Sequence, residues 1–247
     1  MATVVRIEPK VSEIVSCQRT LPIAEIHLGG VSRGAAIVLC RAGGLEHAAV
    51  DILNGLAEHG YESVAADLWP QRHSESDASV DDAALLEDVD ALLGVLAGRG
   101  WSQEQIGIIG YARSGRLALL AAANFGMGAA VSVAAEGLDT DGMKSVRQLT
   151  DALGGIRTPW LGMFGEDDGS AHPATLARLS AALDAGSVFA QIVTYSGVSD
   201  DFYAGSRTWR GRAAEFDCWQ RIVEWLNGRV VPRPTPYAEI WDLRKPK

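Results

Sequence analysis

The stretch Gly110-Tyr111-Ala112-Arg113-Ser114-Gly115-Arg116-Leu117-Ala118 decides how this sequence folds. It follows Ile106–Ile109, an apolar run of the kind that forms a strand covered on both faces. It leads into residues 114–125, where apolar side chains recur at helical spacing. Glycine on both sides of Ala112 lets the chain reverse sharply between the two elements. The stretch therefore predicts a strand, a tight turn at Ala112 and a helix.

The rest of the sequence repeats this alternation of short apolar runs and amphipathic segments. The further strands that we expect are Ala35–Cys40, Ser63–Ala66, Ala129–Val133, Trp160–Phe164 and Phe189–Tyr195. The further helices that we expect lie at residues 45–59, 82–98, 143–153, 173–185 and 209–227. Successive strands are separated by enough chain for a crossover helix, which favours parallel neighbours. We therefore expect an α/β fold, a doubly wound and mostly parallel sheet with helices on both faces.

The two ends of the chain differ from the middle. Residues 1–34 contain short apolar runs around Pro9 and Pro22, which predict strands at an antiparallel edge of the sheet. Residues 228–247 are rich in proline, and Val231–Pro236 predicts an extended strap because proline cannot continue a helix. The sequence contains no internal repeat and no linker, so residues 1–247 are expected to form one domain.

Composition limits the partners that we expect. A hydrophobic fraction of 47% excludes a disordered chain, and no apolar run approaches the length of about 18 residues that a membrane span needs. Acidic residues outnumber basic ones 31 to 22, which argues against a nucleic-acid partner. Three widely spaced cysteines and the absence of a signal-peptide pattern favour the cytoplasm. We expect a small-molecule substrate, no nucleic acid, no membrane, and a monomer or homodimer.

Ligands of open parallel sheets bind beyond the carboxyl ends of the strands, so the residues just after each strand are informative. The glycine-punctuated turn at Ala112 is typical of a nucleophile elbow, which projects a reactive side chain. The run Gly165–Asp168 follows a later strand, in a usual place for the acid of a catalytic triad. The run Tyr195–Phe202 follows the last strand, where a triad histidine would be expected.

At these three places the sequence resembles the dienelactone hydrolase (carboxymethylenebutenolidase) family of the α/β-hydrolase superfamily. The elbow of that family reads Gly-Tyr-Cys-x-Gly-Gly-x-x-Ala, its acid lies in Gly-x-x-Asp, and its histidine lies in Tyr-x-Gly-x-x-His-x-Phe. Gly44-Leu45, Gly60-Tyr61 and Ala66-Asp67-Leu68-Trp69 resemble further landmarks of the family. The resemblance spans about residues 35–227 and implies a sheet of the α/β-hydrolase type.

The resemblance also shows that most of the reactive residues are replaced. The cysteine of the family falls on Ala112, its histidine falls on Asp200, and a glutamate that members often carry falls on Arg41. Only the acid, Asp168, is kept. Ser114 lies two residues past the nucleophile position, inside the helix, and is expected to point elsewhere. We therefore take Asp200, Asp168, Ala112 (as the nucleophile position) and Arg41 as the candidate catalytic positions.

Other residues near these positions are candidates for substrate binding. They are Arg113, Trp69, Cys40, His47, Asp201 and Arg207. Two of them have a purely structural alternative: a buried cysteine for Cys40, and a capping or surface histidine for His47. An ion pair of Arg41 or Arg113 with Asp200, which would lock an inactive site, is a further structural alternative. Trp160 and Trp209 are expected in the core, with Trp69 on a pocket wall.

Backbone N–H groups can act without any particular side chain. Those of Arg113 and of a residue near Arg41 or Ala42 would form an oxyanion hole. No cofactor and no metal are expected, because the histidines and cysteines lack ligand spacing.

Three functions remain open. The first is an enzyme that uses non-hydrolytic acid–base chemistry on a small carbonyl or lactone compound, such as isomerisation, cyclisation or elimination. The second is an ester or lactone hydrolase whose nucleophile has been mutated or relocated. The third is a catalytically dead binding or scaffold protein.

Overall fold

The computed structural model describes residues 6–16, 19–40, 45, 47–68, 82–138, 153, 155–167, 172–199, 201–235, 237–238 and 240. Its strands are β1 (Lys10–Val15), β2 (Thr20–Ile26), β3 (Gly34–Cys40), β4 (Tyr61–Asp67), β5 (Ile106–Tyr111), β6 (Ala129–Val133), β7 (Trp160–Gly165) and β8 (Ala190–Tyr195). Its α-helices are α1 (His47–Glu58), α2 (Asp82–Gly98), α3 (Arg113–Asn124), α5 (Pro173–Asp184) and α6 (Trp209–Arg229), and a 3₁₀ turn, η2, spans Gln103–Gln105.

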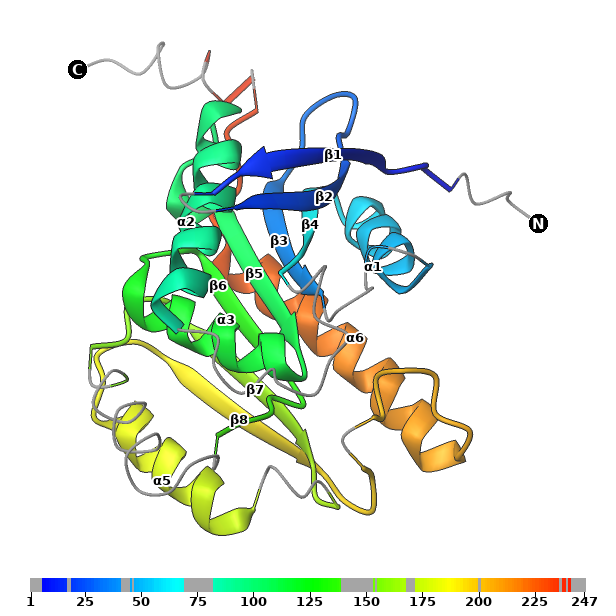
Figure 1. The fold of residues 1–247 in the computed structure, drawn as a ribbon, viewed down its shortest axis with the longest axis vertical. Helices are drawn as coiled ribbons and strands as arrows, with labels where there is room; N and C mark the ends of the chain where they lie inside the picture. Colours follow the sequence, from blue (N-terminus) through cyan, green and yellow to red (C-terminus); the bar gives the residue numbers. More distant parts are fainter. Residues whose placement is uncertain are drawn as a thin grey trace.

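The eight strands form one sheet in the order β1-β2-β4-β3-β5-β6-β7-β8 (Figure 1). The six strands from β4 to β8 in that order are parallel to one another. Strand β2 pairs antiparallel with both β1 and β4, which forms the edge expected from residues 1–34. The doubly wound, mostly parallel sheet predicted from the sequence is therefore confirmed.

Most element boundaries agree with the sequence pattern within two residues. Helix α6 continues to Arg229, so residues 228 and 229 belong to this helix and not to the strap. Residues 231–235 are neither helix nor strand, and Val231 N–H donates to the Glu104 carbonyl at 2.9 Å. The helix expected at residues 143–153 lies outside the described residues, apart from Leu153.

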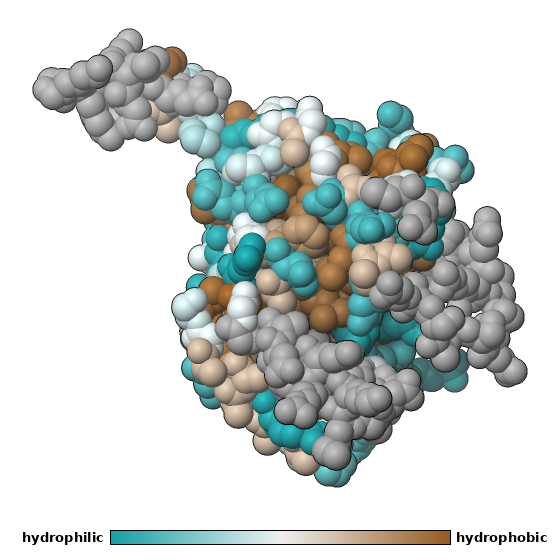
Figure 2. Space-filling model, turned by 60° about the vertical axis from the view of Figure 1, so that its left-hand side comes forward, coloured by the Kyte–Doolittle hydropathy of each residue, from teal (hydrophilic) through white to brown (hydrophobic). Residues whose placement is uncertain are grey.

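Helices cover both faces of the sheet, as the buried strands require. One core joins the sheet to α2, α3 and α5, and a second core joins it to α1 and α6. Figure 1 shows α3 in front of the strands and α6, in orange, behind them. Figure 2 shows hydrophilic residues spread over one face of the protein, with hydrophobic residues gathered through its middle. None of the described helices is long and apolar enough to cross a membrane.

Two tryptophans that the sequence predicts in the core differ in their burial. Trp160 is completely buried and donates through Nε1 to Ser132 Oγ at 2.8 Å. Trp209 is 71% exposed, so the expectation of a core position was wrong for this residue. It is the first residue of α6, where the sheet no longer covers the helix (Figure 1).

Candidate active site

The turn at Ala112 has the backbone conformation that the elbow pattern predicts. Ala112 connects β5 to α3 with φ 52° and ψ −124°, a region that costs a non-glycine residue on the order of 1–3 kcal/mol. Its N–H donates to the Val133 carbonyl at 2.9 Å, and its carbonyl accepts from Gly115 N–H at 2.8 Å and Glu136 N–H at 3.1 Å. These contacts hold the strained turn in place between β5, β6 and α3.

Two glycines of the motif are required by close backbone approach. A Cβ atom on Gly110 would lie 2.0 Å from the carbonyl oxygen of Ser114, in the first turn of α3. A Cβ atom on Gly115 would lie 3.0 Å from Cα of Ala135, in the loop after β6. The helix therefore packs directly on the end of its own strand and on the neighbouring loop. This is the local reason for the glycine spacing in the sequence.

Ser114 is not available as a replacement nucleophile. Its side chain is completely buried, and its Oγ donates to the carbonyl of Cys40 at 3.1 Å, at the end of β3. A second buried hydroxyl, that of Ser132, donates to the Gly115 carbonyl at 2.6 Å. The two bonds tie the first turn of α3 to β3 and β6. The sequence correctly predicted that Ser114 points away from the nucleophile position.

Cys40 is buried in the same region and is poorly suited to nucleophilic attack. Its side chain is 6% exposed, and burial, together with the nearby Asp67, raises the pKa of its thiol to about 12. The thiolate is the reactive form, so Cys40 carries almost no nucleophile at neutral pH. Burial also raises the pKa of the adjacent Tyr111 hydroxyl, which therefore stays protonated.

The loops after β7 and β8 contact each other at the same edge of the sheet. Glu166 N–H donates to the Tyr195 carbonyl at 2.9 Å, and Asp167 N–H donates to the Val198 carbonyl at 3.1 Å. A Cβ atom on Gly165 would lie 2.2 Å from the Val198 carbonyl oxygen. These backbone contacts join the segments that immediately precede the predicted acid and base positions.

Several predicted site residues lie outside the described part of the chain. They are Arg41, Trp69, Asp168 and Asp200, together with the side chain of His47. The roles assigned to them remain predictions. Their chain neighbours Cys40, Leu68, Asp167 and Ser199 all lie at or just beyond the carboxyl ends of β3, β4, β7 and β8.

Four aromatic residues that the sequence analysis did not select as site residues form a row of ring contacts that begins at Tyr111, next to Ala112. Tyr203 lies against Tyr111, with ring centroids 5.2 Å apart, and against Phe202 at 5.9 Å. Phe202 is completely buried and packs on Tyr195 at 5.0 Å. Through these ring contacts the loop after β8 packs against Tyr111, the residue that precedes Ala112. The sequence offered one signal for this aromatic cluster, the adjacent pair Phe202-Tyr203 shortly after a predicted strand.

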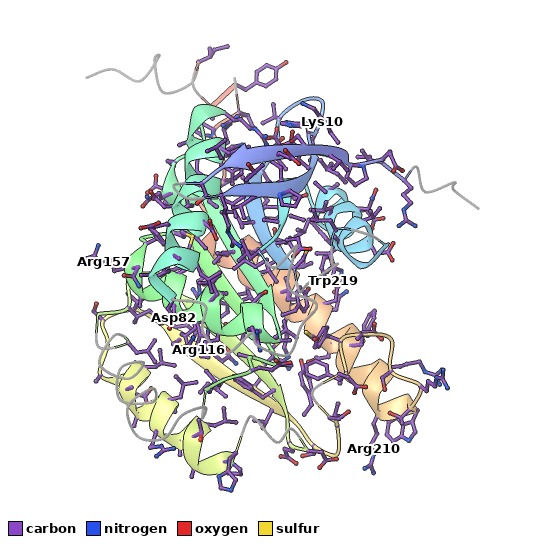
Figure 3. All side chains as sticks on the ribbon, in the orientation of Figure 1. Lys10, Asp82, Arg116, Arg157, Arg210 and Trp219 are labelled. Atoms are coloured by element: carbon purple, nitrogen blue, oxygen red, sulfur yellow. The ribbon has the colours of Figure 1, made fainter. Side chains whose placement is uncertain are left out.

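Three of the charged residues predicted near the site belong to the described part of the chain, and all three are exposed. Arg113 is the exposed first residue of α3, Asp201 is exposed and its carboxylate accepts a hydrogen bond from Ser199, and Arg207 is exposed beside Thr208, the N-cap of α6. Arg116, in the first turn of α3, forms a bidentate ion pair with Asp82 (Figure 3).

Metal binding finds no support among the described residues, where no group of three or more His, Cys, Asp or Glu side chains is placed to hold an ion. His172 lies at the N-cap of α5 and its Nδ1 accepts from Ala174 N–H at 3.3 Å. This histidine therefore caps a helix.

Known proteins resemble this chain both in sequence and in fold. The family model for the dienelactone hydrolase family matches residues 30–229. The chain belongs to the dienelactone hydrolase family. The "Putative carboxymethylenebutenolidase" of Escherichia coli (strain K12) is 27% identical over 190 residues, which cover 72% of this chain and 70% of that protein. The resemblance inferred from the elbow and the two later motifs is thus confirmed.

Solved structures agree with this family member in fold. A crystal structure of a "Putative Dienelactone Hydrolase" from Klebsiella pneumoniae matches with a TM-score of 0.78 and 24% identity, covering 89% of this chain and 98% of that one. A dienelactone hydrolase-like promiscuous phosphotriesterase from metagenomic libraries matches with a TM-score of 0.72 and 18% identity, covering 92% and 100%. At these identities the likeness shows the fold alone.

Proposed function

We propose that this protein binds a small carbonyl or lactone compound at its elbow and moves a proton on it, without forming an acyl-enzyme. The observation that carries the proposal is the elbow conformation at a residue that has no nucleophilic atom, Ala112. The nearest described hydroxyl and thiol, those of Ser114 and Cys40, are buried and unsuited to replace it. A family fold with this elbow can still bind the carbonyl group of its substrates.

The N-terminus of α3 supports the binding of a developing negative charge. The aligned peptide dipoles of a helix place partial positive charge at its first turn, and that turn begins directly after Ala112. An enolate oxygen is such a charge. Arg113, the exposed first residue of α3, adds a cation at the same end of the helix.

The remaining requirement is a group that accepts and returns a proton. We assign this role to the carboxylate of Asp200, which occupies the place of the family histidine in the sequence. In the proposed step, Asp200 removes a proton from the carbon next to the carbonyl, and the electron pair moves to the carbonyl oxygen. Return of the proton at another carbon gives an isomer, with no net gain or loss of atoms.

The proposal can be tested with a β,γ-unsaturated butenolide in D₂O, followed by NMR. We expect a shift of the double bond with uptake of solvent deuterium. Asp200→Asn should reduce both rates by at least about 100-fold, because general base catalysis contributes that much or more. Asp184→Asn, an exposed carboxylate at the end of α5, is the matched control and should leave the rates unchanged. Equal rates in the wild type and Asp200→Asn would refute the role of Asp200.

The rate of hydrolysis of a nitrophenyl acetate tests the alternative function, that of an ester hydrolase acting at the same elbow. The wild type should hydrolyse it near the background rate, since the nucleophile and the histidine are both missing. The double variant Ala112→Cys with Asp200→His should gain a burst of nitrophenol, whereas Ala112→Cys alone should gain far less. A burst from the wild type would identify an ester hydrolase with a relocated nucleophile. If the protein shows neither deuterium exchange nor hydrolysis, and if lactones do not shift its melting temperature, the remaining function is that of a scaffold protein.

A further inference from the structure

The first turns of α6 carry an unusual amount of exposed aromatic surface. Trp209 is 71% exposed and Phe216 is 67% exposed. Residues seven apart lie on the same side of a helix, and the exposed Ala213 and Gln220 fall between and after them on that side. Figure 1 shows this end of α6, in orange, extending past the strands at the lower right. The result is an apolar stripe, Trp209–Ala213–Phe216, that faces away from the core.

The charges on one side of this stripe have an order that is complementary to itself. Arg212 and Glu215 lie there three residues apart, with the arginine first and the carboxylate after it. On the other side lie Arg210 and Asp217, but the Asp217 carboxylate already accepts from the Tyr195 hydroxyl and pairs with Arg221 of the same helix. Figure 3 shows Arg210 at the outer end of the helix.

We propose that the Trp209–Ala213–Phe216 stripe is the interface of a homodimer, with α6 packed antiparallel on α6 of a second copy. An antiparallel arrangement centred near Ala213 places each Arg212 beside Glu215 of the second copy. It also brings Trp209 of one copy next to Phe216 of the other, while Ala213 permits close approach at the crossing. A two-fold interface of this kind uses the same surface on both copies.

The residue types at this surface favour a protein partner over a lipid surface. Tryptophan, phenylalanine and arginine are the residues enriched in protein interfaces. A helix that binds anionic membranes would have a large excess of cations on its polar sides, whereas α6 carries four arginines against three carboxylates. The total charge of −9 further disfavours an anionic surface. The inference does not depend on the proposed reaction, because none of these residues is assigned a role in it.

The oligomeric state of the full chain tests this proposal. Sedimentation velocity over a range of concentrations should show a reversible dimer. Trp209→Ser and Phe216→Ser should each raise the dimer dissociation constant by about tenfold or more, as expected for aromatic residues central to an interface. Tyr237→Ser is the matched control, because Tyr237 is 85% exposed and lies outside the stripe, and it should leave the dimer unchanged.

A charge exchange tests the antiparallel register separately. Arg212→Glu and Glu215→Arg should each weaken the dimer, because each places like charges together across the two-fold axis. The double variant carrying both changes should restore it. Weakening in the double variant by the sum of the two single effects would refute the proposed register.

A cysteine at the crossing gives an independent measurement. Ala213→Cys should form a disulfide-linked dimer under mild oxidation, visible on a non-reducing gel, whereas Gly94→Cys, on a helix elsewhere, should not. A monomer at all accessible concentrations, or a dimer insensitive to the stripe variants, would overturn the proposal. Binding of the monomer to anionic vesicles, lost in Trp209→Ser, would also overturn it and indicate a membrane surface.

Discussion

Replacing Gly110 with alanine should destabilise this protein far more than a single methyl group normally does. The added Cβ atom would lie 2.0 Å from the carbonyl oxygen of Ser114 and 2.5 Å from its carbonyl carbon. Both are backbone atoms in the first turn of α3, so no side-chain rotation can relieve the contact. The strand end and the helix start must move apart by about 1 Å, the difference from an ordinary close contact.

The cost follows from the bonds that this movement would break. The first turn of α3 is held by the bond from Gly115 N–H to the Ala112 carbonyl and by the bond from Ser114 Oγ to the Cys40 carbonyl. Each such bond contributes about 1 kcal/mol, and overpacking in a rigid site costs about 1–3 kcal/mol. We therefore expect Gly110→Ala to lower the free energy of unfolding by about 3–5 kcal/mol. For a chain of this size, the melting temperature should fall on the order of 10 °C.

A matched control separates this contact from the general effect of replacing glycine. Gly94 lies within α2, and a Cβ atom there would have nothing within 4 Å. Gly94→Ala should therefore stabilise the protein by up to about 1 kcal/mol, the difference in helix propensity. Calorimetry or thermal denaturation followed by circular dichroism measures both variants. If Gly110→Ala melts within about 2 °C of the wild type, the close approach of β5 and α3 at the elbow is refuted.

Two further outcomes follow from buried ionisable groups. Cys40 and Cys218 are buried, and burial raises the pKa of both thiols. Alkylation at about pH 8, mapped by mass spectrometry, should therefore leave both unmodified in the native protein and label both in urea. Rapid labelling of Cys40 in the native protein would contradict its burial. Burial opposes ionisation of the Glu25 carboxyl, but the contacts of this carboxyl with Arg99 and His27 have the larger effect and hold its pKa below the ordinary value of 4.5. The charged form of Glu25 therefore stabilises the fold at neutral pH. Glu25→Gln should therefore cost about 1–2 kcal/mol at pH 7. This difference should shrink as the pH falls below 4.5 and be lost once the pH has passed the lowered pKa; a difference that persists in strong acid would exclude the ion pair as its cause.

Local sequence patterns determined the order and type of the main elements. Continuous apolar runs such as Ala129–Val133 matched their strands because a strand buried on both faces needs apolar residues at every position. The glycines at 110 and 115 predicted the elbow because close backbone approach excludes a side chain there. The same nearby residues carried the family resemblance. These signals are short-range, because each depends on residues close in the sequence and not on the strands or helices that pack against them.

The position of Trp209 shows where such patterns fail. Helical spacing indicates which residues share a side of α6, but it does not say how far the sheet extends beneath the helix. The buried side chains of α6 include Ala214, Cys218 and Ile222, which pack beneath the sheet, whereas Trp209 lies at the uncovered end. Burial of an aromatic residue depends on that cover and not on its own hydrophobicity.

The sequence by itself determined the mostly parallel sheet and the tight turn at Ala112, and it predicts that Ala112 replaces the family nucleophile. Only the tertiary structure decided which groups meet around that turn: Ser114 bonded to Cys40, 74 residues away, Tyr203 packed on Tyr111, and the loop after β7 bonded to the loop after β8. The physical reason is that hydrogen bonds and ring contacts depend on distances between strands adjacent in space. A linear sequence specifies those distances only once the strand order β3-β5-β6-β7-β8 is known.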